Sequence, residues 1–394
     1  MKKIEIFTGN RAEFGILLPL IHKLSEIFEI HLLISGAHLL SEWQTVSEIE
    51  EKLSDIDNVK VVKLEMKAGG KSKYDYTLNF SDISRSYIEY KDQNRENIEF
   101  CLFLGDRIET YAYAISAFYL ENILIHIAGG DIANVSTFDS AVKHSITKIS
   151  HLHLVTNRQS YNVVKQMGEQ EWRISDIGMP SLDTINKRYL IPKEELQQKY
   201  NLTSDRLIII TYHPDHYFTA EESLSNFRRI IDGVSDCKHQ TIITYPNNDP
   251  GSELLINEIE NSASRCECIQ VHKNLGTINY LSLLNSMEVI MIGNSSGIVT
   301  ESAFFKTPGL LIGERQKDRV RGNNITELLN FTSEEIHNFV DNTFSNYKNL
   351  VESYKETQYI YGDGKASQKA TDFIVEVLHT KSYEEIISKK FEIL

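Results

Sequence analysis

One local pattern recurs along this chain: a short apolar run, a turn of small residues, and a segment with helical spacing. Residues 289–292 (VIMI) form such a run, residues 293–297 (GNSSG) form the turn, and residues 298–305 have helical spacing. An apolar run of this length is typical of a strand that is buried on both faces of a parallel sheet. The pattern therefore restricts the chain to the α/β class.

The same alternation runs through both halves of the chain. Residues 3–8 and the turn after them begin the first half as the first unit of a doubly wound domain does, although no G-x-G-x-x-G motif is present. The other expected strands lie at residues 30–34, 59–64, 100–104, 123–127, 152–155, 172–177, 207–212, 241–245, 268–272, 289–292 and 310–312. A length of 394 residues favours two domains. We expect two Rossmann-like, doubly wound parallel-sheet domains: residues 1–185, with the helices from about residue 367 packing back on them, and residues 186–366.

Composition argues against several classes of partner. The formal net charge of −14 disfavours a nucleic-acid backbone or an anionic membrane. We expect no signal peptide and no membrane span, because no apolar segment is long enough. The four cysteines suggest a reducing compartment, and Cys266 and Cys268 have no second pair or histidine cluster with which to bind zinc. The expectation is a cytoplasmic protein with no metal and no cofactor.

The turn at residues 293–297 has the composition of an anion site. Ser295 and Ser296 supply hydroxyls, and free backbone N–H groups at the start of a helix add positive potential. Glu301, about one turn further on, can accept two hydrogen bonds from a vicinal diol, and a phosphate beside a ribose means a nucleotide. His213 and Arg315 follow other strands of this half and are candidates to contact a phosphate. The alternative is that the serines only cap a helix.

Charged side chains also follow the strands of the first half. Arg11 lies in the turn after the first strand, where a guanidinium can reach a phosphate; a solvated surface arginine is the alternative. Asp106 and Asp131 follow two other strands, and the carboxyl ends of parallel strands face the ligand crevice. Asp106 can also be read as a helix N-cap. If Asp139 of the next helix joins them, the shared pocket separates their pKa values and allows one acid and one base.

Several motifs occur in order along nearly the whole chain: TGNRAEFG, LGDRIE, HIAGGD, KHSITKISHLH, YHP, PNNDPGS and IGNSSGIVTE with IGERQKDRVRG. In these motifs the chain resembles the hydrolysing UDP-N-acetylglucosamine 2-epimerases of bacterial sialic-acid synthesis. The resemblance implies a GT-B architecture with the active site in the cleft between two Rossmann-like halves. It also implies a UDP-sugar as substrate, no cofactor, and a homodimer or homotetramer.

The resemblance further implies roles for individual residues. Positions that the family uses for the UDP moiety correspond to Arg11, Arg107, His213, Asn247, Ser295, Ser296, Glu301 and Arg315. The candidate catalytic residues are Asp106, Asp131, Asp139, His126 and His213. Many relatives carry Glu or His where this chain has Ala128, which leaves one acid/base position without such a group.

The implied reaction converts UDP-N-acetylglucosamine and water to N-acetylmannosamine and UDP through 2-acetamidoglucal. Two alternatives are the same reaction on a UDP-2,4-diacetamido-6-deoxyhexose and a non-hydrolysing 2-epimerase that keeps UDP on its product. Two further alternatives are a GT-B glycosyltransferase and a nucleotide-sugar-binding protein without turnover.

Overall fold

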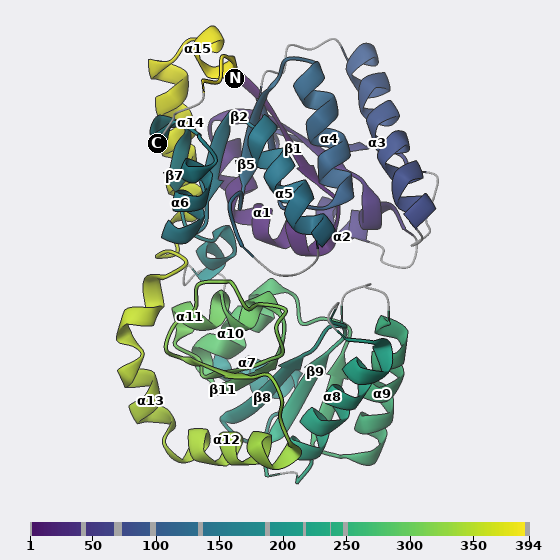
Figure 1. Ribbon diagram of the computed structural model, residues 1–394, viewed down its shortest axis with the longest axis vertical. Helices are drawn as coiled ribbons and strands as arrows, with labels where there is room; N and C mark the ends of the chain where they lie inside the picture. The colour runs from purple at the N-terminus through teal and green to yellow at the C-terminus, as the bar shows by residue number, and fades with distance from the viewer. Residues whose placement is uncertain are drawn as a thin grey trace. The chain divides into compact units, whose positions relative to one another are not determined.

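The computed structural model describes residues 2–40, 45–66, 73–94, 100–132, 137–185, 190–215, 218–236, 238–246 and 251–390. The chain forms two compact units (Figure 1). Unit 1 comprises Met1–Asp131, Thr137–Asp183 and Lys365–Leu394, and the main part of unit 2 is Thr184–Gly364.

Unit 1 is built on a seven-stranded sheet with the order β3-β2-β1-β4-β5-β6-β7, in which every adjacent pair is parallel. Its strands are β1 Lys2–Thr8, β2 Phe28–Ile34, β3 Val59–Lys63, β4 Phe100–Leu104, β5 Ile123–Ile127, β6 Leu152–Val155 and β7 Ile174–Asp176. The strand order reverses between β1 and β4. In open α/β sheets, ligands bind outside the carboxyl ends of the strands at such a switch point.

Helices cover both faces of this sheet (Figure 1). They are α1 Arg11–Ser25, α2 Thr45–Lys52, α3 Lys73–Gln93, α4 Ile108–Tyr119, α5 Thr137–Ile149, α6 Arg158–Gln166, α14 Ala366–Thr380 and α15 Tyr383–Ile387. Successive strand side chains point to opposite faces, so β1 contributes to two cores. Ile4 and Ile6 belong to the core formed with α1 and α14, whereas Phe7 belongs to the core formed with α3 and α4.

The core under α3 and α4 contains a buried carboxylate. Glu5 of β1 is fully buried and its Oε2 accepts hydrogen bonds from the hydroxyls of Tyr87 at 2.7 Å and Tyr113 at 3.0 Å. The ammonium of Lys91, at the more exposed end of the cluster, lies 3.0 Å from Oε1. A buried charge is tolerated when it is paired and hydrogen-bonded in this way.

The last two helices belong to the first unit although they follow the second in sequence. The carboxylate of Asp183 accepts hydrogen bonds from the backbone N–H groups of Ala366 at 2.8 Å and Ser367 at 2.5 Å, which satisfies the first donors of α14. The guanidinium of Arg173 donates to the carbonyls of Glu385 at 3.0 Å and Ile386 at 2.7 Å in α15. These bonds hold both helices on unit 1.

Unit 2 has a six-stranded, fully parallel sheet with the order β10-β9-β8-β11-β12-β13. Its strands are β8 Arg206–Thr211, β9 Gln240–Thr244, β10 Ile269–His272, β11 Glu288–Gly293, β12 Gly309–Ile312 and β13 Ile325–Leu328. Its helices are α7 Lys193–Lys199, α8 Ala220–Val234, α9 Ser252–Arg265, α10 Thr277–Ser286, α11 Glu301–Phe305, α12 Ser333–Ser345 and α13 Tyr347–Ser353. The order reverses between β8 and β11, which repeats the arrangement of unit 1. Across the described parts of both units, no helix combines the length and apolarity that crossing a membrane requires.

Candidate active site

Unit 1 brings two of the predicted aspartates together at the carboxyl edge of its sheet. Asp106 follows β4 and Asp131 follows β5, and the ammonium of Lys143 from α5 contacts both. Lys143 Nζ lies 2.9 Å from Asp106 Oδ2 and 3.8 Å from Asp131 Oδ2, and it donates to the Asp131 carbonyl at 3.2 Å. The two carboxylates therefore share one counter-ion beside the switch point.

His126 of β5 is fully buried and lies close enough to Asp106 and Lys143 to interact with their charges. Its Nε2 lies 2.8 Å from the carbonyl oxygen of Gly105, and its Nδ1 lies 3.2 Å from the hydroxyl of Thr147. Because a carbonyl only accepts, Nε2 carries the proton of the neutral ring; the single hydrogen of the Thr147 hydroxyl is directed to the Lys143 carbonyl at 2.9 Å, and Nδ1 lies beside that hydroxyl. Burial lowers the pKa of His126 to about 3, so the ring is neutral. Gly129 is needed here, since a Cβ at this position would stand 2.9 Å from Nδ1.

Two further carboxylates lie beside the same switch point. Glu13 is buried in the first turn of α1, where its Oε2 accepts the N–H of Gly9 at 2.8 Å. Glu109 is buried in the first turn of α4, 3.5 Å from Nε of Arg107. Burial raises the pKa of Glu13 to about 7, against the opposing effect of Arg107, while Glu109 and Asp106 add smaller increases. Glu13 thus exchanges its proton near neutral pH.

The other predicted residues of unit 1 are placed differently. Arg11 is exposed on the first turn of α1 and pairs with Glu48 of α2 at 2.8 Å, so a phosphate would have to compete with that carboxylate. Asp139 lies within α5, but its side chain is outside the described part of the structure. Ala128 has a positive φ of 62° at the turn after β5.

In unit 2 the ends of β8, β11 and β12 converge around Asn294. The buried amide of Asn294 accepts the backbone N–H of His213 at 2.7 Å and donates to the His213 carbonyl at 2.9 Å. The Asn294 carbonyl accepts from Gln316 at 3.1 Å and from Arg315 at 3.5 Å. Burial, and secondarily the charge of Arg315, lowers the pKa of His213 well below its usual value. The neutral imidazole of His213 and the guanidinium of Arg315 therefore lie at the same edge of the sheet of unit 2.

The turn after β11 carries Ser295, partly exposed, and Ser296, exposed. Glu301 follows at the start of α11, where its Oε2 accepts the hydroxyl of Thr300. Gly297 stands between this carboxylate and Tyr280, because a Cβ at position 297 would lie 2.7 Å from the Tyr280 hydroxyl and 3.3 Å from Glu301 Oε2.

The expectation of a helix over residues 298–305 is wrong in extent. A 3-10 turn spans Ser296–Ile298, and α11 contains only Glu301–Phe305. The helix ends at Lys306 with φ 56°, and Thr307 precedes a proline, which disfavours helical backbone. The site at this turn therefore consists of its hydroxyls and N–H groups, with little helix dipole. Asn247 is outside the described residues.

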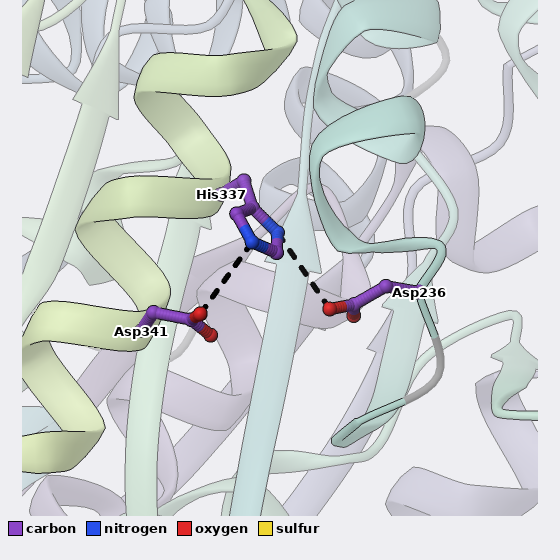
Figure 2. A group of neighbouring side chains, drawn as sticks. All are labelled: Asp236, His337 and Asp341. Atoms are coloured by element: carbon purple, nitrogen blue, oxygen red, sulfur yellow. Dashed lines mark ion pairs between the residues drawn. The ribbon is translucent and has the colours of Figure 1, made fainter.

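One cluster in unit 2 has the composition of a metal site. Within the described part of the chain, the only group of metal-ligating side chains is Asp236, His337 and Asp341 (Figure 2). Lys238 Nζ lies 3.3 Å from Asp236 Oδ2 and 2.9 Å from Asp341 Oδ2, so an ammonium already pairs with both carboxylates. Asp236 precedes β9 and is thus at the amino edge of the sheet, opposite the residues that follow β8 and β11. We assign it no part in the site.

Comparison with known proteins bears on the chemistry of this arrangement. The sequence model of the UDP-N-acetylglucosamine 2-epimerases matches residues 22–375. The chain belongs to this family. It is 31% identical over 332 residues to GDP/UDP-N,N'-diacetylbacillosamine 2-epimerase (hydrolyzing) of Campylobacter jejuni, covering 83% of this chain and 84% of that protein. It is 28% identical over 343 residues to UDP-N-acetylglucosamine 2-epimerase of Neisseria meningitidis, covering 82% and 83%.

The fold of this chain agrees with its membership of the 2-epimerase family. The structure of UDP-GlcNAc 2-epimerase from Neisseria meningitidis bound to UDP-GlcNAc has a TM-score of 0.73 at 18% identity, covering 95% of this chain and 100% of that chain. The predicted fold class, two Rossmann-like parallel-sheet units of the GT-B type, is confirmed.

Three residues of the site in this 2-epimerase family member are absent from the residues predicted from the sequence: Lys143, Glu13 and Asn294. They lie within the motifs KHSITK, NRAEFG and IGNSSG, respectively. For Glu13, the available signal was an acid three residues after Asn10, which caps α1.

Proposed function

We propose that this protein is a hydrolysing 2-epimerase that converts UDP-N-acetylglucosamine and water to N-acetylmannosamine and UDP. The observation that carries the proposal is the pair of carboxylates, Asp106 and Asp131, that share the ammonium of Lys143 at the switch point of unit 1. Inversion of a carbon that bears hydrogen requires one group to remove a proton and another to return it. Family membership supports C2 of a UDP-sugar as that carbon.

The proposed chemistry proceeds by elimination and addition. The C1–O bond breaks, its electron pair leaves with UDP, and the positive character at C1 makes the C2 hydrogen acidic. A carboxylate of the Asp106 and Asp131 pair takes that proton, and the C2–H electrons form the C1–C2 double bond of 2-acetamidoglucal. Water then adds its hydroxyl to C1, and C2 receives a proton on the opposite face. The atoms of the UDP-sugar and water equal those of the inverted sugar and UDP, and no atom is oxidised or reduced overall.

The residues of unit 2 suit the leaving group. UDP departs with additional negative charge, and preorganised donors stabilise such charge best. Arg315 supplies a guanidinium, the neutral ring of His213 supplies one N–H, and Ser295 and Ser296 supply hydroxyls. We assign Glu301 to the ribose diol.

Burial changes the role that we assign to His126. Both ring nitrogens are engaged within the protein, at Gly105 and Thr147. We therefore assign it to positioning the loop that carries Asp106 rather than to contact with the sugar. The assignments of Asp139 to the sugar and of Arg11 and Arg107 to the diphosphate rest on the motif resemblance.

A second candidate substrate is a UDP-2,4-diacetamido-6-deoxyhexose. The 31% identical relative is named for a diacetylated sugar of this kind, whereas the Neisseria relative is named for UDP-N-acetylglucosamine. Both reactions use the same proton transfers at C2, so they differ in the pocket around C4 and C6.

The deciding experiment offers the purified protein both UDP-sugars in separate reactions in heavy water and follows the products by NMR. The proposal expects free UDP together with an inverted sugar that carries deuterium at C2. A product that keeps UDP would indicate the non-hydrolysing reaction, and a product without deuterium at C2 would refute proton transfer there. The faster of the two reactions identifies the sugar.

A further inference from the structure

Lys143 is enclosed by the two aspartates that it contacts. Its side chain is 5% exposed, and three oxygens surround its ammonium: Oδ2 of Asp106, Oδ2 of Asp131 and the Asp131 carbonyl. An ammonium has three N–H donors. Two of these donors are directed at Asp106 Oδ2 and the Asp131 carbonyl, and the Asp131 carboxylate, at 3.8 Å, is close enough for an ion pair but not for a hydrogen bond.

The backbone of Lys143 is also linked to the loop that carries Asp106. The hydroxyl of Thr147, one turn further along α5, lies 2.9 Å from the Lys143 carbonyl and 3.2 Å from Nδ1 of His126. His126 in turn donates to the carbonyl of Gly105, the residue before Asp106. The contacts form a closed ring from Asp106 through Lys143, Thr147, His126 and back to the Asp106 loop. Neither the lysine nor the loop can shift without disturbing a buried hydrogen bond.

We propose that Lys143 is a positioning residue that holds the Asp106 and Asp131 carboxylates together at the carboxyl edge of the sheet, an inference that rests on the proposed function. Two like charges in one crevice repel, and an opposite charge between them favours ionisation of both. The charged and titratable groups around the pair are Lys143 and His144 of α5, His126 of β5, Glu13 of α1, and Arg107 and Glu109 at the start of α4.

The two aspartates are not equivalent toward this lysine. Asp106 lies at hydrogen-bond distance, whereas the Asp131 carboxylate is 0.9 Å further away, the difference between 3.8 and 2.9 Å. Coulomb attraction falls with distance, so Lys143 attracts the Asp106 carboxylate more strongly than the Asp131 carboxylate. Removing the lysine should therefore affect Asp106 more than Asp131.

The test compares Lys143→Met, which keeps most of the side-chain volume and removes the charge, with Lys143→Arg, which keeps the charge. The matched control is Lys165→Met, which removes a lysine from an exposed ion pair with Glu171 in the same unit. Three quantities are measured for each: kcat/KM against pH, UDP affinity by calorimetry, and the carbon-13 resonances of the aspartate carboxyls against pH. Asp106→Asn and Asp131→Asn assign those resonances.

We expect Lys143→Met to lower kcat/KM by at least about tenfold near neutral pH and to move the acid limb of the profile up by about one pH unit. UDP affinity should stay within about twofold, and Lys143→Arg should restore most of the limb. An unmoved limb in Lys143→Met, or an arginine variant as impaired as the methionine one, would overturn the inference. So would equal losses in Lys165→Met.

The carboxyl resonances separate this inference from the proposed function. If the wild-type protein converts neither UDP-sugar, the proposed function fails, and the resonances alone decide the role of Lys143. Aspartate signals that titrate at higher pH in Lys143→Met, with Asp106 moving further than Asp131, support it. Signals that titrate as in the wild type overturn it.

Discussion

Glu13 gives the most quantitative prediction of the structure. Burial raises its pKa from 4.5 to about 7, so the folded protein binds this proton more tightly than the unfolded chain does. The associated stability is fully present below pH 4.5 and is lost as the pH rises through about 7. This difference in pKa corresponds to about 3 kcal/mol of free energy of unfolding, since a tenfold change in proton affinity corresponds to about 1.4 kcal/mol. Glutamine at this position is always neutral and can still accept the N–H of Gly9.

Glu13→Gln should therefore be more stable than the wild type at about pH 8.5 by up to about 3 kcal/mol, with little difference at about pH 4. Hydrogen exchange of the slowest amides of β1 and α1 measures this free energy for unit 1 alone. The control is Glu222→Gln, at the matching position of the capping box of α8 in unit 2, where the glutamate is exposed; its effect is measured on the slowest amides of β8 and α8 and should be the same at both pH values. A difference between Glu13→Gln and wild type that is the same at both pH values would refute the reasoning.

Three other variants test the site and the fold. Asp106→Asn should keep UDP affinity while turnover falls by about 10²–10⁴-fold, which calorimetry and a UDP-release assay measure separately. Gly297→Ala places a methyl group 2.7 Å from the hydroxyl of Tyr280, so the tyrosine ring or the turn has to move. We expect UDP binding to weaken about tenfold, and unchanged binding would argue against this turn as the UDP site. Lys91→Met leaves the buried carboxylate of Glu5 without its ammonium and should cost about 3 kcal/mol in unit 1, measured by hydrogen exchange, with catalysis per folded molecule unchanged.

The sequence was sufficient for the fold class and the family because both are encoded locally. Short apolar runs such as residues 289–292 and 123–127, each followed by a turn of small residues, lie on parallel strands of the two sheets. The strand that was not predicted, β13, is Ile325–Leu328 at the edge of its sheet, with two exposed side chains and no continuous apolar run. An edge strand pairs on one side only, so its sequence is under weaker constraint.

The candidate site was less predictable because its geometry depends on packing between distant segments. The positions of Asp106 and Asp131 after parallel strands placed them correctly at one edge of the sheet, but nothing in the sequence indicates that Lys143 lies between them. Burial is also a tertiary property: it raises the pKa of Glu13 and encloses His126, which the motif alone presents as a candidate catalytic residue. The roles of individual residues remain predictions for the experiments above.

The return of α14 and α15 to unit 1 has a consequence for synthesis of the chain. A ribosome completes Thr184–Gly364 before it makes the segment Ala366–Thr380 that covers α1. The domain whose sequence begins first is therefore the last to obtain its full core, and until then Leu17, Leu20 and their neighbours lack the side chains of α14. Domains fold as units, so we expect the second to acquire its native structure during translation while the first waits for its final helices.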